Sequence, residues 1–285
     1  MRSAAAAILL VAIACTEGAP PESPRPGASA GVPPGRIVSL LPSFTEIILA
    51  LGLRDRLVGV SAFSPEGVEG IRSVGGLADP DLEAILALDP DLVIGMGSRT
   101  TTAVRRKIEE AGLPCLFLAN ETLADALEAI LAIGERAGRA GEARALRARI
   151  EGEIASVETS VRGARPVRAA IVVQRRPMIL AGPGSFLGEL LGRAGGENIA
   201  ADAASPHPQF DLESFAVRAP EVIIDVSGSY RSAAPEDGFL EEWRRLPSTP
   251  ALETGRIHPL PPGIPINPGP RVAELFRFIA SKLHP

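Results

Sequence analysis

One phrase occurs twice in this chain, and the repeat limits the folds that the sequence can adopt. The segment DPDLEAILALDPDLVIG (79–95) returns without a gap as QFDLESFAVRAPEVIID (209–225), an offset of 130 residues. Identical positions include Asp81, Leu82, Glu83 and Pro90 in the first copy and Asp211, Leu212, Glu213 and Pro220 in the second. Since each copy is long enough for a helix and a strand, we expect two lobes of similar structure.

Both copies have the pattern of a short helix that leads into a buried strand. In the first copy Asp79 can cap the helix, with Pro80 at its first position. Apolar side chains that share one helical face, and so should meet the core, are Leu82, Ile85 and Leu86, and then Leu212, Phe215 and Ala216. Each helix is followed by an apolar run without alternation, as in a strand covered on both faces: Leu92–Ile94 and Val222–Ile224.

Glu83 and Glu213 occupy the same position in the two copies. We expect each carboxylate to lie in the first turn of its helix and to point away from the core. A carboxylate at that position complements the helix dipole, which is the simplest explanation for either glutamate taken alone.

A second sequence similarity relates the beginnings of the two halves. Ser43-Phe44 lies near the start of the first half as Ser185-Phe186 does in the second. The aligned residues that follow are Glu46, Ile47, Ile48 and Gly52 in the first half and Glu189, Leu190, Leu191 and Gly195 in the second. Strands alternate with helices in both halves, so the predicted fold is α/β with mostly parallel sheets.

The two predicted lobes are separated by a helical segment. The first lobe should span residues 36–120 and the second 167–285, with a bridge over 121–166. Within the bridge, 142–161 forms an uninterrupted helical pattern that would be roughly 30 Å long. A break is expected near Gly138 and Gly141.

Composition excludes some classes of function. Hydrophobic residues make up 46% of the chain and charged residues 22%, which indicates a soluble globular protein with a full core. The net charge is −5, and no basic cluster carries interleaved aromatic residues. Nucleic acid is therefore not an expected partner.

The N-terminus has the pattern of an export signal. Residues 1–14 begin with basic Arg2, continue with an apolar stretch and end in Ala-Ile-Ala directly before Cys15. Residues 15–35 are rich in Pro, Gly, Ser and Ala and should form an extended tether. The arrangement resembles that of a bacterial lipoprotein, which implies a lipid on Cys15 and a membrane anchor; Ala-Ile-Ala would also suit ordinary signal peptidase. Either way the chain is expected to be exported.

Cys115 is the second cysteine of the chain and lies in the apolar run LPCLFLA. With Cys15 at the processing site, no structural disulfide is expected. Cys115 should be a core thiol rather than a nucleophile, because its neighbours are apolar and no histidine lies nearby in the sequence.

Several separated segments together resemble a known family. They are, in chain order, RIVSLLPSFTEIILALGLRDRLVGV, LEAILALDPDLVIG, GELLGRAGGENIA, LESFAVRAPEVII and NPGPRVAELFRFIASKL. They resemble the periplasmic binding proteins that serve ABC importers of cobalamin, haem and siderophores, and the resemblance covers residues 36–285 as one binding domain. It implies two α/β lobes joined by a backbone helix, with a ligand cleft between them. It also implies a monomeric periplasmic receptor, not an enzyme, that holds no resident cofactor and delivers a metal chelate to an ABC importer permease.

The resemblance gives the two repeated glutamates a second interpretation. In that family a surface glutamate on each lobe is thought to dock onto arginines of the permease, and the matching positions here are Glu83 and Glu213. Two such contacts would favour orientation and encounter rate more than affinity.

The resemblance, together with the rule that α/β sheets bind ligands at the carboxyl ends of their strands, places the ligand in loops. The candidate cleft residues are Ser43, Phe44, Phe63, Leu77, Ser98, Ser185, Phe186, His207, Gly263 and Asn267. Leu77 and His207 stand where cobalamin receptors of the family have tryptophans, and Gly263 and Asn267 replace expected polar contacts. Aromatic residues make up 4% of the chain, so the cleft is a poor stacking platform. The ligand is left open among a cobalamin-like corrinoid, haem and a ferric siderophore.

His207 lies between Pro206 and Pro208 and is the cleft candidate with metal-binding chemistry. A neutral imidazole can ligate haem iron or corrinoid cobalt, although a lone loop histidine is more often a plain polar contact. A site for bare zinc or manganese is not expected, because the first lobe contains no histidine.

Two other classes of function stay open at the level of the sequence. A hydrolase would need a nucleophile with a base, and Ser185 with His207 is the pairing that the chain offers, without a GxSxG elbow. The other class is a surface lipoprotein that has lost its ligand and uses the fold for protein contacts.

Overall fold

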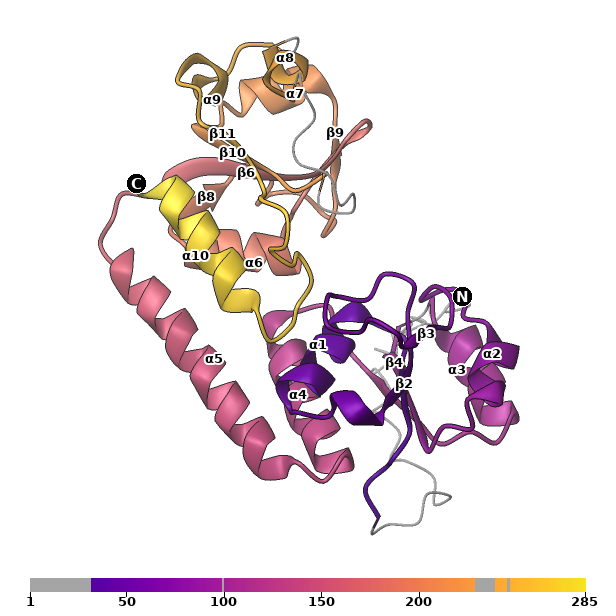
Figure 1. Cartoon of the computed structure of the whole chain (residues 1–285). Helices are drawn as coiled ribbons and strands as arrows, with labels where there is room; N and C mark the ends of the chain where they lie inside the picture. The colour runs from indigo at the N-terminus through magenta and orange to yellow at the C-terminus, as the bar shows by residue number, and fades with distance from the viewer. Residues whose placement is uncertain (1–31, 99, 229–238, 245–246) are drawn as a thin grey trace, which may run out of the picture. The chain divides into compact units, whose positions relative to one another are not determined.

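A computed structural model describes residues 32–98, 100–228, 239–244 and 247–285 of the chain (Figure 1). The chain divides into the units Met1–Gly31 and Val32–Pro285, and only the second is described. The predicted signal peptide, Cys15 and most of the predicted tether therefore lie outside the described residues.

The first lobe contains a five-stranded sheet in the order β3-β2-β1-β4-β5. Its strands are β1 (Ile37–Ser39), β2 (Leu57–Val60), β3 (Arg72–Ser73), β4 (Leu92–Met96) and β5 (Cys115–Leu118). Every neighbouring pair is parallel, so all five strands end at the same edge of the sheet. The predicted parallel sheet is confirmed.

Helices cover both faces of the first sheet because its strand residues alternate between two hydrophobic clusters. Ile37 packs in the cluster that contains buried residues of α1 (Pro42–Ala50) and α4 (Leu123–Arg136). Val38, the next residue, packs with buried residues of α2 (Leu82–Ala87) and α3 (Thr102–Glu110). A 3₁₀ turn, η1 (Arg54–Arg56), precedes β2.

The second lobe contains a sheet in the order β11-β10-β6-β7-β9, with β8 also paired to β6. Its strands are β6 (Val167–Arg175), β7 (Met178–Leu180), β8 (Gly196–Asn198), β9 (Gln209–Phe210), β10 (Val222–Asp225) and β11 (Ile257–Pro259). Strand β7 is antiparallel to β6 and β9, and the remaining pairs are parallel. The prediction of a mostly parallel sheet is confirmed.

Helices also cover both faces of the second sheet. Buried residues of α6 (Phe186–Arg193) and α10 (Val272–Leu283) share a cluster with Ile171 and Ile224. On the other face, Phe215 of α7 (Leu212–Val217) packs with α8 (Phe239–Arg244) and α9 (Pro250–Glu253). The ring centroids of Phe215 and Trp243 lie 6.3 Å apart.

The bridge between the sheets is the helix α5 (Ala140–Ser160), 21 residues long. It packs against α4 and α10 (Figure 1). Its buried residues Ala143, Leu146, Ile150, Ile154 and Val157 belong to the same hydrophobic cluster as residues of both sheets. The helical segment breaks between Arg136 and Ala140, near Gly138 and Gly141 as predicted, with φ of 73° at Gly138.

The repeated phrase forms the same helix and strand in both lobes, with caps that match. Asp81 accepts a hydrogen bond from the Ala84 amide at 2.9 Å, and Asp211 accepts one from the Ser214 amide at 2.7 Å. The helix therefore begins two residues later than expected. Asp79 is not the cap, and Pro80 forms a bridge with Gly75 instead.

The repeat extends to the end of each helix. Asp89 and Ala219, which directly precede the repeated prolines, have φ of 43° and 45°. Positive φ is uncommon outside glycine, so its presence at the same position in both lobes indicates a shared chain reversal between helix and strand.

The predicted core face of these helices is only partly correct. Ile85 and Phe215 are buried, as expected. Leu86 and Leu212 are exposed, which corrects the expectation that both meet the core. Each helix has six residues, and its buried residues are Ala84 and Ile85 in α2 and Phe215 in α7.

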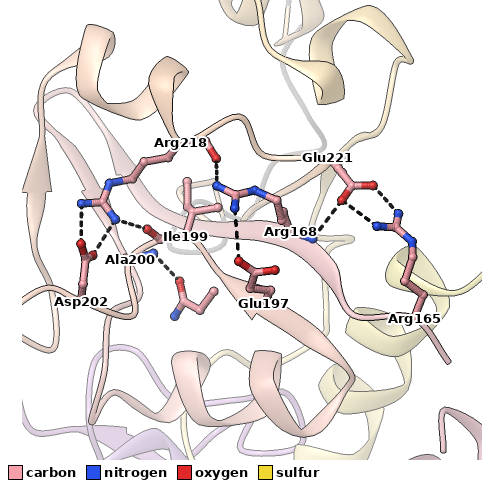
Figure 2. A network of polar contacts seen from close by, with 9 residues as sticks. Arg165, Arg168, Glu197, Ile199, Ala200, Asp202, Arg218 and Glu221 are labelled. Atoms are coloured by element: carbon pink, nitrogen blue, oxygen red, sulfur yellow. Dashed lines mark hydrogen bonds and ion pairs between the residues drawn. The ribbon is translucent and has the colours of Figure 1, made fainter. Parts of the chain in front are cut away.

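An arginine at the start of each lobe binds the end of the repeated helix. In the first lobe the Nη2 of Arg36 donates to Leu88 O at 2.6 Å, and its backbone amide donates to Asp91 at 2.8 Å. In the second lobe Arg168 donates to Arg218 O, and its amide donates to Glu221 at 3.4 Å (Figure 2). The two lobes thus share these contacts as well as the helix and strand.

Candidate functional site

Loops at the carboxyl edge of the first sheet bring Phe63 close to Gly76, the residue before Leu77. The Ala62 amide donates to Gly75 O at 2.8 Å, which joins the loops after β2 and β3. A Cβ on Gly76 would lie 4.0 Å from the Phe63 ring. Phe63 is 76% exposed and presents an apolar ring at this edge, whereas Leu77 is half-buried and packs against the core.

Ser43 and Phe44 follow β1 but are enclosed. Ser43 is buried and its hydroxyl accepts a hydrogen bond from Asn120 Nδ2 at 3.0 Å. Phe44 has no exposed surface and packs in the core. Because an enclosed ring cannot contact a ligand, Phe44 does not fit the role of a cleft residue.

Asn120 was not a sequence candidate, although it follows the last strand of the first sheet. It is buried, and its Oδ1 has no hydrogen-bond partner in the described part of the chain. Its partner Ser43 is 77 residues away in the sequence, and no local pattern signals a contact of that range.

Ser98 follows β4 and takes part in a local turn. Its hydroxyl lies 2.8 Å from Thr100 Oγ1 and 3.1 Å from Thr101 Oγ1, and its amide donates to Thr101 Oγ1 at 3.0 Å. These contacts fix the chain before α3, and they engage the Ser98 hydroxyl in the turn.

Two loops of the second lobe lie side by side and carry Ser185 and His207. The Gly182 amide donates to Pro206 O at 2.8 Å, and the Leu180 amide donates to Pro208 O at 3.1 Å. His207 is exposed. Its backbone amide donates to the Ser205 hydroxyl at 3.3 Å.

Ser185 is the cap of α6. Its hydroxyl donates to Gly182 O at 2.7 Å and accepts from the Gly188 amide at 3.0 Å. The proton that a base would remove is held by a carbonyl oxygen, so the pairing of Ser185 with His207 as nucleophile and base gains no support. Phe186, the first residue of the helix, is 6% exposed and packs in the core.

The segment between β11 and α10 carries Gly263 and Asn267, both exposed. Arg271 holds this segment, since its Nη2 donates to Gly263 O at 2.8 Å. Arg271 also forms an ion pair with Glu274 at 2.6 Å. Its Nη1 lies 3.8 Å from Glu46 in α1 of the first lobe. The contacts of Arg271 thus link a predicted ligand loop to the first helix of the other lobe.

Glu46 is a buried acid within this link. Burial raises its pKa to about 7; the Arg271 guanidinium opposes this rise and the Glu274 carboxylate adds to it. Sequence comparison of the two halves aligned Glu46 with Glu189 but gave no sign of its burial or of its partner.

Cys115 is a free thiol, half-buried at the start of β5. Burial raises the pKa of the Cys115 thiol above its usual value. A raised pKa keeps the thiol protonated and weakly reactive, which agrees with the expected core role.

Among the described residues, no group of three or more His, Cys, Asp and Glu side chains is arranged to hold a metal ion. In the same part of the chain, none of the helices has the length and hydropathy that crossing a membrane requires.

Known proteins that resemble this chain have the same two-lobed arrangement. A family described as periplasmic binding protein matches residues 37–263. The chain belongs to the periplasmic binding protein family. Members are binding proteins rather than enzymes, they are exported to the periplasm, and they work with the permease of an ABC importer.

Similar members of this periplasmic binding protein family carry names that refer to tetrapyrroles. The vitamin B12-binding protein of Vibrio parahaemolyticus is 28% identical over 80% of this chain and 82% of its own. The cobalamin-binding protein of Halobacterium salinarum is 28% identical over 88% of this chain and 70% of its own. The solved haem-binding protein RhuT of Roseiflexus sp. RS-1 is 27% identical, with a TM-score of 0.75 over 87% of this chain and 97% of its own.

Both repeated glutamates lie where a partner protein can reach them. Glu83 is in the first turn of α2 and Glu213 in the first turn of α7, and both are exposed. The predicted position and exposure of the two carboxylates are confirmed.

Proposed function

We propose that this chain is the solute receptor of an ABC importer, which captures a cobalamin-like corrinoid or an iron chelate and delivers it to the permease. The observation that carries the proposal is the repeated helix and strand, which gives each lobe one exposed carboxylate at the same position, Glu83 and Glu213. A partner with two cationic contact points would hold both lobes at once, and such contacts raise the encounter rate and fix the orientation.

The proposed ligand site lies in the cleft between the lobes. From the first lobe, exposed Phe63 and neighbouring Leu77 supply apolar contacts. From the second lobe, His207 and Asn267 supply polar ones, and Gly263 lies exposed in the same segment as Asn267. A mostly apolar surface with a few polar groups is what a large planar chelate requires.

Haem or a ferric siderophore is the alternative cargo, with His207 near the ligand. Two observations favour it: His207 is exposed in a loop that two prolines stiffen, and the relative RhuT is named as a haem-binding protein. An exposed neutral imidazole is able to ligate haem iron.

Absorbance titration of the purified chain tests the cargo. Cyanocobalamin, haem and ferrichrome are added separately, and bound ligand is separated from free by gel filtration. We expect saturable binding of one of the three. If haem binds, His207→Ala should shift its Soret band, whereas the control His258→Ala should not. Failure of all three to bind would contradict the proposed cargo class.

The proposal includes a lipid anchor on Cys15 that holds the receptor at the membrane as a monomer. The support is the sequence alone, because Cys15 lies outside the described residues. Replacement of Cys15 by Ser should release the exported chain from the membrane fraction, and retention of the variant there would contradict the anchor.

A further inference from the structure

The ligand segment, residues 260–270, belongs to the second lobe by sequence but packs against the first lobe. It connects β11 to α10 and carries Gly263 and Asn267, both exposed. The residues on either side of Asn267 are buried, and so is Gly269. A Cβ on Gly269 would lie 3.4 Å from Ser43 Cβ in α1. The two proposed ligand residues of this segment therefore depend for their position on a contact with the other lobe.

The side chain of Arg271 fixes the course of the ligand segment. Its Nη2 donates to Gly263 O at 2.8 Å, which ties the beginning of the segment to its end. Gly263 has a φ of 84°, a backbone conformation that glycine adopts without strain. The Nε and Nη2 of Arg271 also donate to the two carboxylate oxygens of Glu274, at 2.8 and 2.6 Å. A guanidinium makes these contacts together because its donors form a rigid fork, which a lysine lacks.

The carboxyl group of Glu46, on α1, faces both the ligand segment and Arg271. Its Oε1 lies 3.8 Å from Arg271 Nη1, which is too long for a hydrogen bond. A Cβ on Gly269 would lie 3.3 Å from its Oε2. Since the Glu46 side chain is largely buried, the ligand segment lies against an acid that is mostly removed from water.

The packed position of the ligand segment favours the protonated form of Glu46. Burial raises the pKa of Glu46 to about 7; among the described residues, the charged groups that act on it are Arg271, which opposes the rise, and Glu274, which adds to it. Glu66 acts on Arg271 instead. When the segment leaves α1, water reaches the carboxyl group and its pKa returns toward 4.5. Glu46 therefore stabilises the packed position fully at low pH, and this stabilisation is lost as pH rises through about 7.

We propose that Arg271 is a positioning residue of the ligand site, and that protonation of Glu46 keeps the ligand segment packed on the first lobe while ionisation releases it. The inference rests on the proposed receptor function and adds a regulation of its site. Because only the packed segment presents Gly263 and Asn267 to the ligand, release lowers the fraction of receptor that is competent to bind. The receptor thus holds its ligand more tightly at acid than at alkaline pH.

Hydrogen exchange of the ligand-segment amides, in the full-length protein without ligand, tests the packed position. Protection factors at pH 6 and pH 8 are corrected for the intrinsic pH dependence of amide exchange. Glu46→Gln replaces the acid by a neutral side chain of similar size. Arg277→Gln is the matched control for Arg271→Gln, because Arg277 lies on the same helix and its side chain is 52% exposed.

For a group whose pKa is about 7, protection of the segment in the unchanged chain should fall about tenfold from pH 6 to pH 8. In Glu46→Gln it should stay constant. Arg271→Gln should reduce protection at both pH values, and its remaining pH dependence should move to higher pH, because the guanidinium no longer opposes the raised pKa of Glu46. A purely structural arginine would not move this pH. The control should behave as the unchanged chain does.

Two results of the exchange experiment would overturn the inference. Equal pH dependence of protection in the unchanged chain and in Glu46→Gln would show that Glu46 does not control the segment. Normal protection in Arg271→Gln would show that Arg271 does not position it.

Binding of cyanocobalamin, haem and ferrichrome at the same two pH values separates this inference from the receptor function. The probe that binds should do so more weakly at pH 8 than at pH 6, by a factor of up to about ten, and this difference should be absent in Glu46→Gln. If a probe binds with the same pH dependence in both proteins, the receptor function stands and the regulation of its site is overturned. If all three probes fail while exchange behaves as expected, the proposed cargo class is contradicted and the control of the segment by Glu46 stands.

Discussion

Arg271 Nη1 lies 3.8 Å from Glu46 Oε1, and this ion pair joins the segment before α10 to the first helix of the other lobe. Arg271 also binds Gly263 O and Glu274, so one guanidinium connects a proposed ligand loop, α10 and α1. The Glu46 side chain is only 12% exposed, which makes its charge state matter for stability.

Stability should depend on pH through Glu46. Burial raises its pKa from 4.5 to about 7, so the folded chain holds this proton more tightly than the unfolded chain. The resulting stabilisation is complete below about pH 4.5 and is lost as pH rises through about 7. Between these two pH limits the contribution of Glu46 to the free energy of unfolding changes by an amount on the order of 3 kcal/mol.

Urea unfolding at pH 5 and pH 8 measures this dependence. Glu46→Gln, which mimics the protonated acid, should remove most of it, whereas the aligned variant Glu189→Gln should not, because the Glu189 side chain is 38% exposed. An unchanged pH dependence in Glu46→Gln would show that Glu46 does not carry the effect.

Gly269 should tolerate no branched side chain, because its segment lies directly against α1. A Cβ there would come within 3.3 Å of Glu46 Oε2 and 3.4 Å of Ser43 Cβ. We expect Gly269→Val to lower the free energy of unfolding by about 1–3 kcal/mol. Gly152→Ala is the control: it lies inside α5 with no atom within 4 Å of the added Cβ, and should be stabilising by about 0.5–1 kcal/mol. Equal stability of Gly269→Val and the unchanged chain in thermal melting would contradict this contact.

Asp81 and Asp211 should each stabilise the chain as helix caps. Replacement of either by Ala should cost about 1 kcal/mol in the free energy of unfolding. Asp79→Ala is the matched control, because Asp79 lies two residues before the observed cap and should have little effect. A larger loss in Asp79→Ala than in Asp81→Ala, measured by denaturant unfolding, would favour the cap expected from the sequence.

The repeat made much of the fold predictable, because its two copies obey the same local rules. The helix, the following strand and the exposed glutamate depend on residues within one phrase, and all three are present in both lobes. The repeat itself favours Asp81 as the cap, because the second copy has Gln209 at the position of Asp79 and Asp211 at the position of Asp81. The first copy alone offers both Asp79 and Asp81, which are good capping residues. The bridge at Gly75 and Pro80 decides between them, and it depends on a neighbouring loop.

The errors in the predicted core face have a geometric origin. Helical spacing shows which residues share a side of a helix, but not how the helix is rotated against a sheet. In α2 the buried pair is Ala84 and Ile85, which leaves Leu86 turned outward. Phe44 and Phe186 were candidates because they follow strands, yet both point into the core.

The long-range contacts of the candidate site were beyond prediction from one sequence. Ser43 binds Asn120 and Glu46 pairs with Arg271, and these partners are far apart in the chain. No periodicity or motif connects such positions. Only the fold, which brings the ends of separate elements together, reveals the contacts.

In the proposed receptor function, the two lobes present Glu83 and Glu213 to one importer. The most direct measurement is ligand-stimulated ATP hydrolysis by the importer in proteoliposomes, with the receptor variant Glu83→Gln, Glu213→Gln. A second double variant, Glu110→Gln with Glu253→Gln, is the control, because it removes the same charge from exposed side chains outside α2 and α7. We expect the first variant to bind cyanocobalamin or haem as the unchanged receptor does but no longer to stimulate hydrolysis, while the control does both. Full stimulation by the first variant would contradict docking through Glu83 and Glu213.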